Sequence, residues 1–307
     1  GKPKMETLNR QYLQMGDYDE NNWQELRAVY QAMCMKVDEQ FGRLCDALRQ
    51  AGIYDDSAIF FFSDHGDYAG DYGLVEKAQN CFEDVLTRVP FLIKPPQGMP
   101  VDPGISGSLV ELVDFYATAM DFAGVSPTRT QFGRSLRPVV GDRSAAVRQY
   151  ACCEGGRLPG ETHCDEYHDG RGRESSPNTP YWPKKMAQLD DEAHARATMI
   201  RDAHFKYVSR ILGQDELYDL ESDPGETRNL IDDPLYADEV SRLQTALLKW
   251  LQSTSDVVPF DHDRRFDDEK LWMMVRRLVP AERADEVRGM IRAGIDIGEL
   301  FRHVHSL

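Results

Sequence analysis

The sequence lacks the features that would tie it to a membrane or to nucleic acid. No apolar run approaches the ~20 residues that a helix needs to cross a bilayer. Lysine and arginine together number 36 against 52 aspartates and glutamates, which gives a net charge of -16. Because a chain of this charge repels polyanions and anionic lipid surfaces, we expect neither nucleic acid nor a membrane as its main partner.

Cysteine is scarce, and a signal-peptide pattern is missing. The chain has 6 cysteines among 307 residues and no C-x-x-C pair, which argues against a disulfide scaffold and against a zinc site. We therefore expect mostly reduced thiols, which favour a cytoplasmic location. The first 22 residues contain neither an initiator methionine at position 1 nor a signal peptide, so we expect that the natural chain begins further upstream.

The first half of the chain alternates helical and strand patterns. Residues 21–52 carry apolar side chains at the 3 and 4 spacing of one helical face. Residues 58–62 form an apolar run typical of an interior strand, 91–93 predict a short strand, and 108–124 predict a second helix. This order predicts an α/β sandwich with a mostly parallel sheet between helices.

The second half has a different pattern. Residues 155–195 are rich in glycine, proline, histidine and charge and predict a long loop. Residues 197–211 predict two strands around a tight turn, 216–220 another short strand, and 234–254 an amphipathic helix. We therefore expect a smaller antiparallel sheet with a packed helix.

These patterns divide the chain into three parts. Residues 1–150 are expected to form the C-terminal part of an α/β domain, and 151–265 a small subdomain. Residues 266–307 alternate helical segments with charge and are expected to form a helical tail, through which the chain would form a homo-oligomer.

The segment Ser63-Asp64-His65-Gly66, directly after the first apolar strand, is the strongest chemical signal. Ligands gather beyond the carboxyl ends of strands in α/β sheets. A carboxylate and an imidazole on adjacent residues can both bind one divalent cation, Ca²⁺ or Mg²⁺ with oxygen partners and Mn²⁺ or Zn²⁺ with nitrogen. The alternative is a plain turn in which Asp64 accepts backbone hydrogen bonds.

A series of motifs in a fixed order resembles the sulfatase family of the alkaline phosphatase superfamily. The series comprises Tyr30, "VDEQFG" at 37–42, "SDHGD" at 63–67, "GLVEK" at 73–77, "RVPFLIKPP" at 88–96, "GRSL" at 133–136 and "ELYDLESDPGETRNL" at 216–230. The resemblance covers about residues 25 to 255 and implies an alkaline phosphatase-like fold.

The resemblance implies a role for three residues. Asp64 and His65 would be metal ligands, most simply for Ca²⁺, with Mg²⁺ or Mn²⁺ as alternatives. Lys77 would bind the sulfate group and the bridging oxygen and would act in catalysis, whereas an isolated lysine is usually a solvated surface side chain. The implied activity is that of a sulfuric ester hydrolase, with a small anionic sulfate ester as substrate.

Two elements of the family pattern are missing. The letters Cys-x-Pro/Ala-x-Arg, in which the family's cysteine becomes formylglycine, the nucleophile, occur only at residues 45–49. These residues lie inside the run predicted as a helix and after the landmark at 37–42, so we do not expect the nucleophile there. The N-terminal Asp-Asp pair that supplies further metal ligands in the family is missing too, since no such pair precedes these landmarks. We therefore expect both in an N-terminal segment outside these 307 residues, and we expect this chain alone to be inactive.

The long loop contains candidate substrate-binding residues. Arg157, His163 or His168 could lie at the mouth of the cleft, because arginine pairs with sulfate and carboxylate groups through two hydrogen bonds. The alternative is a loop with ordinary surface polar residues.

Two other functions stay open at this point. The superfamily also hydrolyses phosphodiesters and phosphonate monoesters with nearly the same site. The chain could also be a non-catalytic fragment or an interaction module.

Overall fold

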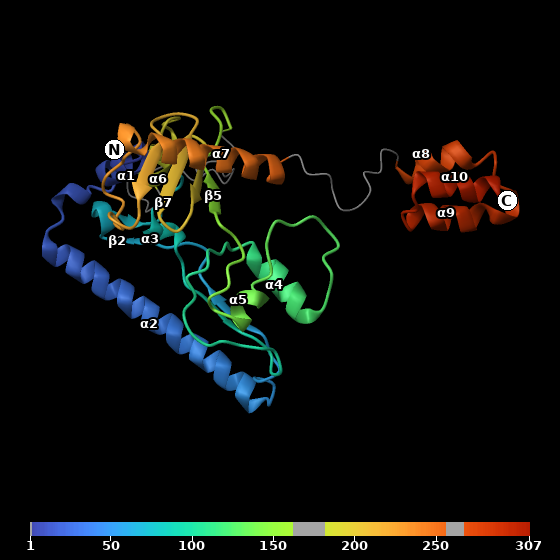
Figure 1. The fold of residues 1–307 in the computed structure, drawn as a ribbon, viewed down its shortest axis with the longest axis horizontal. Coiled ribbons are helices and arrows are strands. Elements are labelled where there is room, and N and C mark those ends of the chain that lie inside the picture. Colours follow the sequence, from blue (N-terminus) through green and yellow to red (C-terminus); the bar gives the residue numbers. More distant parts are fainter. Residues whose placement is uncertain (1, 162–181, 256–266) are drawn as a thin grey trace. The chain divides into compact units, whose positions relative to one another are not determined.

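The computed structural model describes residues 2–161, 182–255 and 267–307 (Figure 1). The chain divides into two compact units, one of residues 1–126 with 132–254 and the other of residues 127–131 with 255–307. Within the described ranges, no helix combines the length and apolar character that a membrane span requires.

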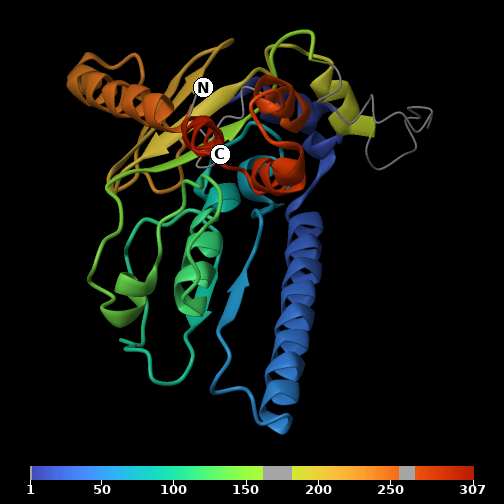
Figure 2. The same cartoon turned by 90° about the vertical axis from the view of Figure 1, so that its right-hand side faces the viewer.

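The long helix α2, Glu20–Gln50, confirms the helix predicted at 21–52. Asp19 begins it, because its side chain accepts a hydrogen bond from the Asn22 amide at 3.0 Å while the Asn22 side chain accepts from the Asp19 amide at 3.0 Å. Gly52 follows its end with φ +70°, a conformation that glycine adopts without strain. Helix α2 lies alongside β1, Ile59–Phe62, where the rings of Phe41 and Phe61 are 4.8 Å apart (Figure 2).

Strand β1 pairs with β4, Phe91–Lys94, in a two-stranded antiparallel sheet. The register places Phe62 opposite Phe91. The predicted parallel sheet is not confirmed, because every pair of named strands in the described residues is antiparallel; one isolated parallel bridge joins Arg157 and Ala195. Parallel neighbours need a crossover connection, and between these two strands the described chain forms only short elements: β2 Tyr68–Ala69, β3 Val75–Glu76 and α3 Asp84–Thr87.

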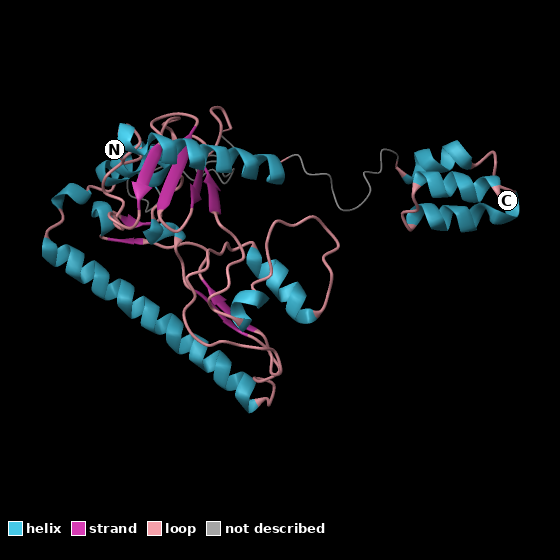
Figure 3. Ribbon diagram, in the orientation of Figure 1, coloured by secondary structure: helices cyan, strands magenta, loops and turns pink. Residues whose placement is uncertain are grey.

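The prediction of a small antiparallel sheet with a packed helix is confirmed. The strands lie in the order β5-β6-β7-β8 (Figure 3), with bounds Ala151–Gly155, Ala197–Arg201, Phe205–Arg210 and Glu216–Asp219. Helix α7, Ala237–Thr254, packs on the sheet and buries Leu243 and Leu247 against Ile200, Tyr207 and Leu217. Helix α7 places its apolar side on the sheet, so the sheet has one face that the helix covers.

A buried ion cluster holds α4, Asp114–Ala123, against the segment that enters β5. The Arg148 guanidinium donates to both carboxylate oxygens of Asp114, with Nη2 to Oδ1 at 2.6 Å. Asp114 also accepts from the Glu111 and Arg134 amides, each at 2.8 Å. Because its carboxylate has four donors, Asp114 can be fully buried while charged.

Residues 267–307 of the second unit form three α-helices, as the alternating pattern of the tail predicts. They are α8 Asp268–Val275, α9 Ala284–Arg292 and α10 Ile297–His305. Their apolar faces meet in one buried cluster of Leu271, Val275, Val287, Ile291, Leu300 and Val304. The described residues also form α1 Lys4–Tyr12, α5 Arg137–Gly141, α6 Trp182–Gln188 and short 3-10 helices at Met15–Asp17, Asp71–Gly73, Pro234–Tyr236 and Ala281–Arg283.

The packing of α7 leads to a stability prediction. Leu243 is 0% exposed and Leu248 on the same helix is 56% exposed. Leu243→Ala should lower the free energy of unfolding by about 2 to 5 kcal/mol, because it leaves a cavity. Leu248→Ala, the matched control, should change it by less than about 0.5 kcal/mol. Urea unfolding measures both, and equal losses would contradict this packing.

Candidate active site

Backbone hydrogen bonds fix the turn that follows β1. The Ser63 hydroxyl donates to the His65 carbonyl at 2.7 Å, and the His65 amide donates to Asp64 Oδ1 at 3.0 Å. The Gly66 amide donates to the carbonyl of Leu86 in α3 at 2.8 Å. These bonds hold the turn and present the two side chains that the sequence predicts as metal ligands.

Gly66 is required by a close approach of two backbone segments. A Cβ atom at this position would lie 1.9 Å from the Val85 carbonyl oxygen, far inside van der Waals contact. The φ angle of Gly66 is not positive, so the glycine is required by the lack of space and not by its backbone conformation. The glycine of the Asp-His-Gly motif is therefore a packing requirement.

The side chains of Asp64 and His65 lie close enough to share one cation. His65 Nε2 and Asp64 Oδ2 are 3.9 Å apart, and the Asp64 side chain is 85% exposed. Two atoms bound to one divalent cation at about 2.0 to 2.5 Å lie roughly 3 to 5 Å apart. The pair therefore fits a single cation.

The tautomer of His65 suits this role. Its Nδ1 lies 2.9 Å from the Gly66 carbonyl oxygen, which can only accept a hydrogen bond. Nδ1 must then carry the proton, and the lone pair of Nε2 is left for a metal. Among the described residues, no third His, Cys, Asp or Glu completes a ligand group with this pair.

Lys77 lies directly after the β2–β3 hairpin. The hairpin pairs Tyr68 with Glu76, and the Lys77 side chain is exposed. Its neighbour Glu76 has φ +59° and forms a 2.6 Å ion pair with the buried Lys184 of α6. The hydrogen bond from Lys184 lowers the pKa of the Glu76 carboxyl, while burial opposes this. The predicted role of Lys77 is not tested by these contacts.

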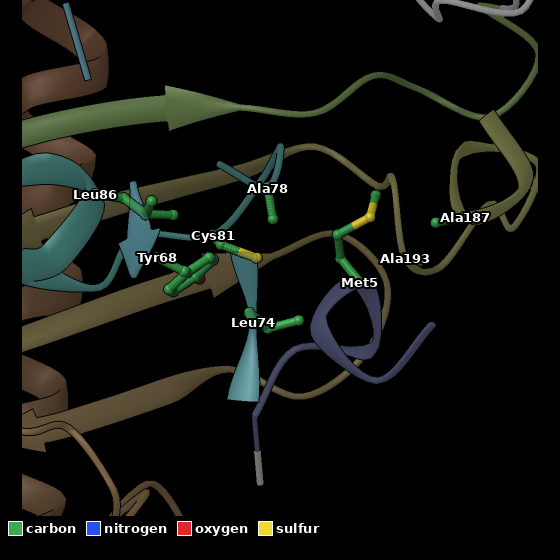
Figure 4. Close-up of a cluster of buried hydrophobic side chains, with 8 residues drawn as sticks. All are labelled: Met5, Tyr68, Leu74, Ala78, Cys81, Leu86, Ala187 and Ala193. Carbon is green, nitrogen blue, oxygen red and sulfur yellow. The ribbon is translucent and has the colours of Figure 1, made fainter. Parts of the chain in front are cut away.

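A cluster of buried side chains anchors the hairpin to α1. It consists of Met5, Tyr68, Leu74, Ala78, Cys81, Leu86, Ala187 and Ala193 (Figure 4). Leu74 and Ala78 flank Lys77 in the sequence, and Met5 comes from α1. The backbone on both sides of Lys77 is thus held, whereas the lysine side chain faces outward.

Of the loop residues proposed for substrate binding, the structure describes only Arg157. The Arg157 side chain is buried, with its guanidinium donating to Asp191 Oδ1 and to the Gln188 carbonyl, each at 3.2 Å. These contacts give Arg157 a structural role and lend no support to the predicted role in substrate binding. His163 and His168 lie outside the described residues.

Two contributors escaped the sequence analysis. Helix α1 was not predicted, although Glu6 and Arg10 at i and i+4 are a helical signal. Lys184 lies in the later part of the loop predicted at 155–195, and no local sequence pattern predicts its contact with Glu76. Tertiary packing alone brings both to the hairpin.

The comparisons with known proteins assign the chain to a family. Residues 5–125 match the sulfatase family model. A choline-sulfatase of Rhizobium meliloti is 29% identical over 265 residues, which are 85% of this chain and 44% of that protein. A multifunctional alkaline phosphatase superfamily protein, PehA of Trinickia caryophylli, is 27% identical over 78% of this chain and 42% of its own length.

A solved structure extends this likeness to the fold. The phosphonate monoester hydrolase of Agrobacterium radiobacter superimposes with a TM-score of 0.62 at 27% identity, over 77% of this chain and 43% of that one. An arylsulfatase K of Danio rerio is 31% identical over 219 residues, which are 70% of this chain and 35% of that protein. The chain belongs to the sulfatase family of the alkaline phosphatase superfamily. It spans less than half the length of these relatives.

The close approach at Gly66 can be tested by adding one methyl group. Gly66→Ala should destabilise the chain by about 1 to 3 kcal/mol, because the turn or α3 must move. Gly42→Ala is the control: no atom lies within 4 Å of its Cβ position inside α2, so the helix should gain roughly 0.5 to 1 kcal/mol. Thermal unfolding distinguishes the two, and a neutral Gly66→Ala would contradict the described contact.

Proposed function

We propose that this chain carries one metal-ligand pair and the substrate lysine of a sulfuric ester hydrolase that cleaves sulfate esters. The observation that carries the proposal is the Asp64–His65 pair, with Nε2 and Oδ2 3.9 Å apart at the end of β1, in a chain of the sulfatase family. The formylglycine nucleophile and the remaining metal ligands would come from a polypeptide segment outside these 307 residues.

Asp64, His65 and Lys77 would each have a separate role in the reaction. A divalent cation, Ca²⁺ first and Mg²⁺ or Mn²⁺ as alternatives, would supply charge neutralisation at the sulfate oxygens. Asp64 and His65 would hold it, with the His65 ring oriented by the Gly66 carbonyl. Lys77 would donate hydrogen bonds to the sulfate and to the bridging oxygen, where negative charge develops as the S–O bond breaks.

An exposed apolar surface on α2 and β4 supports the proposal that a further polypeptide segment packs against this chain. Four side chains on one face of α2 are more than half exposed: Val29, Met33, Val37 and Leu44. Leu92 on β4 is also more than half exposed. Because a continuous apolar face of this kind usually contacts another protein surface, we infer that the missing part of the sandwich covers it and that the isolated chain does not turn over substrate.

A phosphonate monoester or phosphodiester hydrolase is the second candidate. Its support is the likeness at 27% identity to the phosphonate monoester hydrolase of Agrobacterium radiobacter. Purified enzyme that contains this chain should be assayed on 4-nitrophenyl sulfate and on a matching phosphonate monoester. A higher kcat/KM for the sulfate supports the first candidate and a higher value for the phosphonate supports the second, while inactivity on both supports a non-catalytic module.

Lys77→Ala in that enzyme should cut kcat by about 10²- to 10³-fold, because it removes a preorganised donor to developing charge. The loss should shrink for aryl sulfates with acidic leaving groups, whose oxygen needs less stabilisation. Lys249→Ala, at an exposed lysine of α7, is the control and should leave kcat unchanged. If Lys77→Ala retains the wild-type kcat on good and poor leaving groups alike, Lys77 has no catalytic role.

Metal binding by the isolated chain should be weak, because two side chains leave most positions around Ca²⁺ to water. Titration calorimetry with Ca²⁺ should show no tight binding, and Asp64→Ala should remove what binding there is. Tight binding that Asp64→Ala abolishes would show that the described residues already complete the site.

A further inference from the structure

A buried acidic cluster lies beneath the hairpin that carries Lys77. It joins Glu6 of α1 to Cys81 and Glu83 of the segment before α3, with ligand atoms within 4.8 Å of one another. The three residues are 0%, 6% and 1% exposed, respectively. Two carboxyl groups this close and this well buried cannot both carry a charge without strong compensation.

The compensation is unequal between the two acids. Glu83 accepts a hydrogen bond from the Tyr68 hydroxyl at 2.9 Å and from Lys2 Nζ at 3.0 Å. Glu6 has only a long ion pair to Arg10 at 3.8 Å, and within the described residues no hydrogen-bond donor reaches either of its oxygens. The negative charge therefore belongs on Glu83, and Glu6 is the acid that keeps a proton.

The surroundings leave no need for a metal. One positive charge, on Lys2, balances the single carboxylate of Glu83. Burial raises the pKa of the Cys81 thiol well above its ordinary value, so the thiol adds no further negative charge to the cluster. The titratable groups that face Glu6 are Lys2, Arg10, Tyr68, Tyr72, Cys81 and Glu83, while Lys184 of the neighbouring α6 pairs with Glu76.

We propose that Glu6 and Glu83 share one proton, and that this pair positions the Lys77 hairpin by holding α1 against it. Met5, adjacent to Glu6, packs in the cluster with Leu74 and Ala78 on either side of Lys77 (Figure 4). Glu83 reaches the same hairpin through Tyr68. Positioning of the hairpin matters for catalysis only through the proposed role of Lys77. The proton shared by Glu6 and Glu83 does not depend on that role.

The pair has a defined pH dependence. Burial first, and then the adjacent Glu83, raise the pKa of Glu6 to about 9. Although burial opposes it, contact with Glu6 and Lys2 lowers the pKa of Glu83 to about 2. Between the ordinary value of 4.5 and about 9, the folded chain holds a proton at Glu6 that the unfolded chain has released. Stability therefore falls as pH rises through this window. The contribution of Glu83 is lost only at acidic pH, as pH falls below 4.5 toward about 2.

The test compares wild type with Glu6→Gln in this chain, with no need for turnover. A carboxamide mimics the protonated acid and does not titrate, so Glu6→Gln should fold and should lose the decline in Tm between pH 6 and 9. In wild type the decline attributable to Glu6 should reach up to about 3 °C per pH unit. Glu25→Gln, at an exposed acid of α2, is the control and should keep the wild-type slope.

Amide hydrogen exchange tests the positioning role separately. After correction for intrinsic exchange, residues 74–81 of wild type should lose protection by roughly tenfold between pH 8 and 9.5. Glu6→Gln should keep this protection over the same pH range.

Several results would overturn the proposal. These are a Glu6→Gln chain that fails to fold, equal Tm slopes in wild type and Glu6→Gln, or hairpin exchange that does not distinguish them. A rise in Tm with Zn²⁺ that Glu6→Gln abolishes would also overturn it, because the cluster would then hold a metal in place of a proton. None of these outcomes depends on which ester the enzyme hydrolyses.

Discussion

The contact between Gly66 and α3 is the constraint on which the candidate site depends. The Gly66 amide donates to the Leu86 carbonyl at 2.8 Å, and there is no room for a side chain between this turn and Val85. The Asp64–His65 turn is thereby tied to α3 and not only to its own strand. Whatever positions α3 therefore positions the predicted metal ligands.

The segment that enters α3 is held by charge. Asp84 accepts from Lys206 Nζ at 2.7 Å and from Arg201 Nη1 at 2.9 Å, and both donors belong to the four-stranded sheet. The Asp84 amide donates to Glu226, which in turn accepts from Lys206 at 2.6 Å. Lys206 is fully buried, and among the described residues these partners and the Phe82 carbonyl support its charge. The small sheet is in this way a support for the site and not a separate appendage.

The region that matches the family model contains the exposed apolar face of α2. The family model covers residues 5–125, which include α1, α2, β1, the hairpin and β4. In this stretch α2 buries only Cys45, although its apolar residues recur at helical spacing. Most of the apolar stripe of this helix is therefore uncovered by the described residues, apart from the contact of Phe41 with Phe61.

Local sequence patterns determined much of this protein. Apolar periodicity predicted α2, the strands at 59–62 and 197–210, and α7, because such patterns depend on a few consecutive residues. The motif after β1 predicted Asp64 and His65 as neighbours, since adjacent residues need no tertiary structure to be close.

Only the tertiary structure decided how distant segments meet. The antiparallel pairing of β1 with β4, the burial of Arg157, and the meeting of Glu6 with Glu83 each join residues separated by at least 29 positions. No local pattern encodes such a contact, because its free energy comes from packing and from the charges that burial forces into pairs. The sequence by itself determined the elements and the chemical groups, and folding decided which of those groups are charged, covered or free to bind.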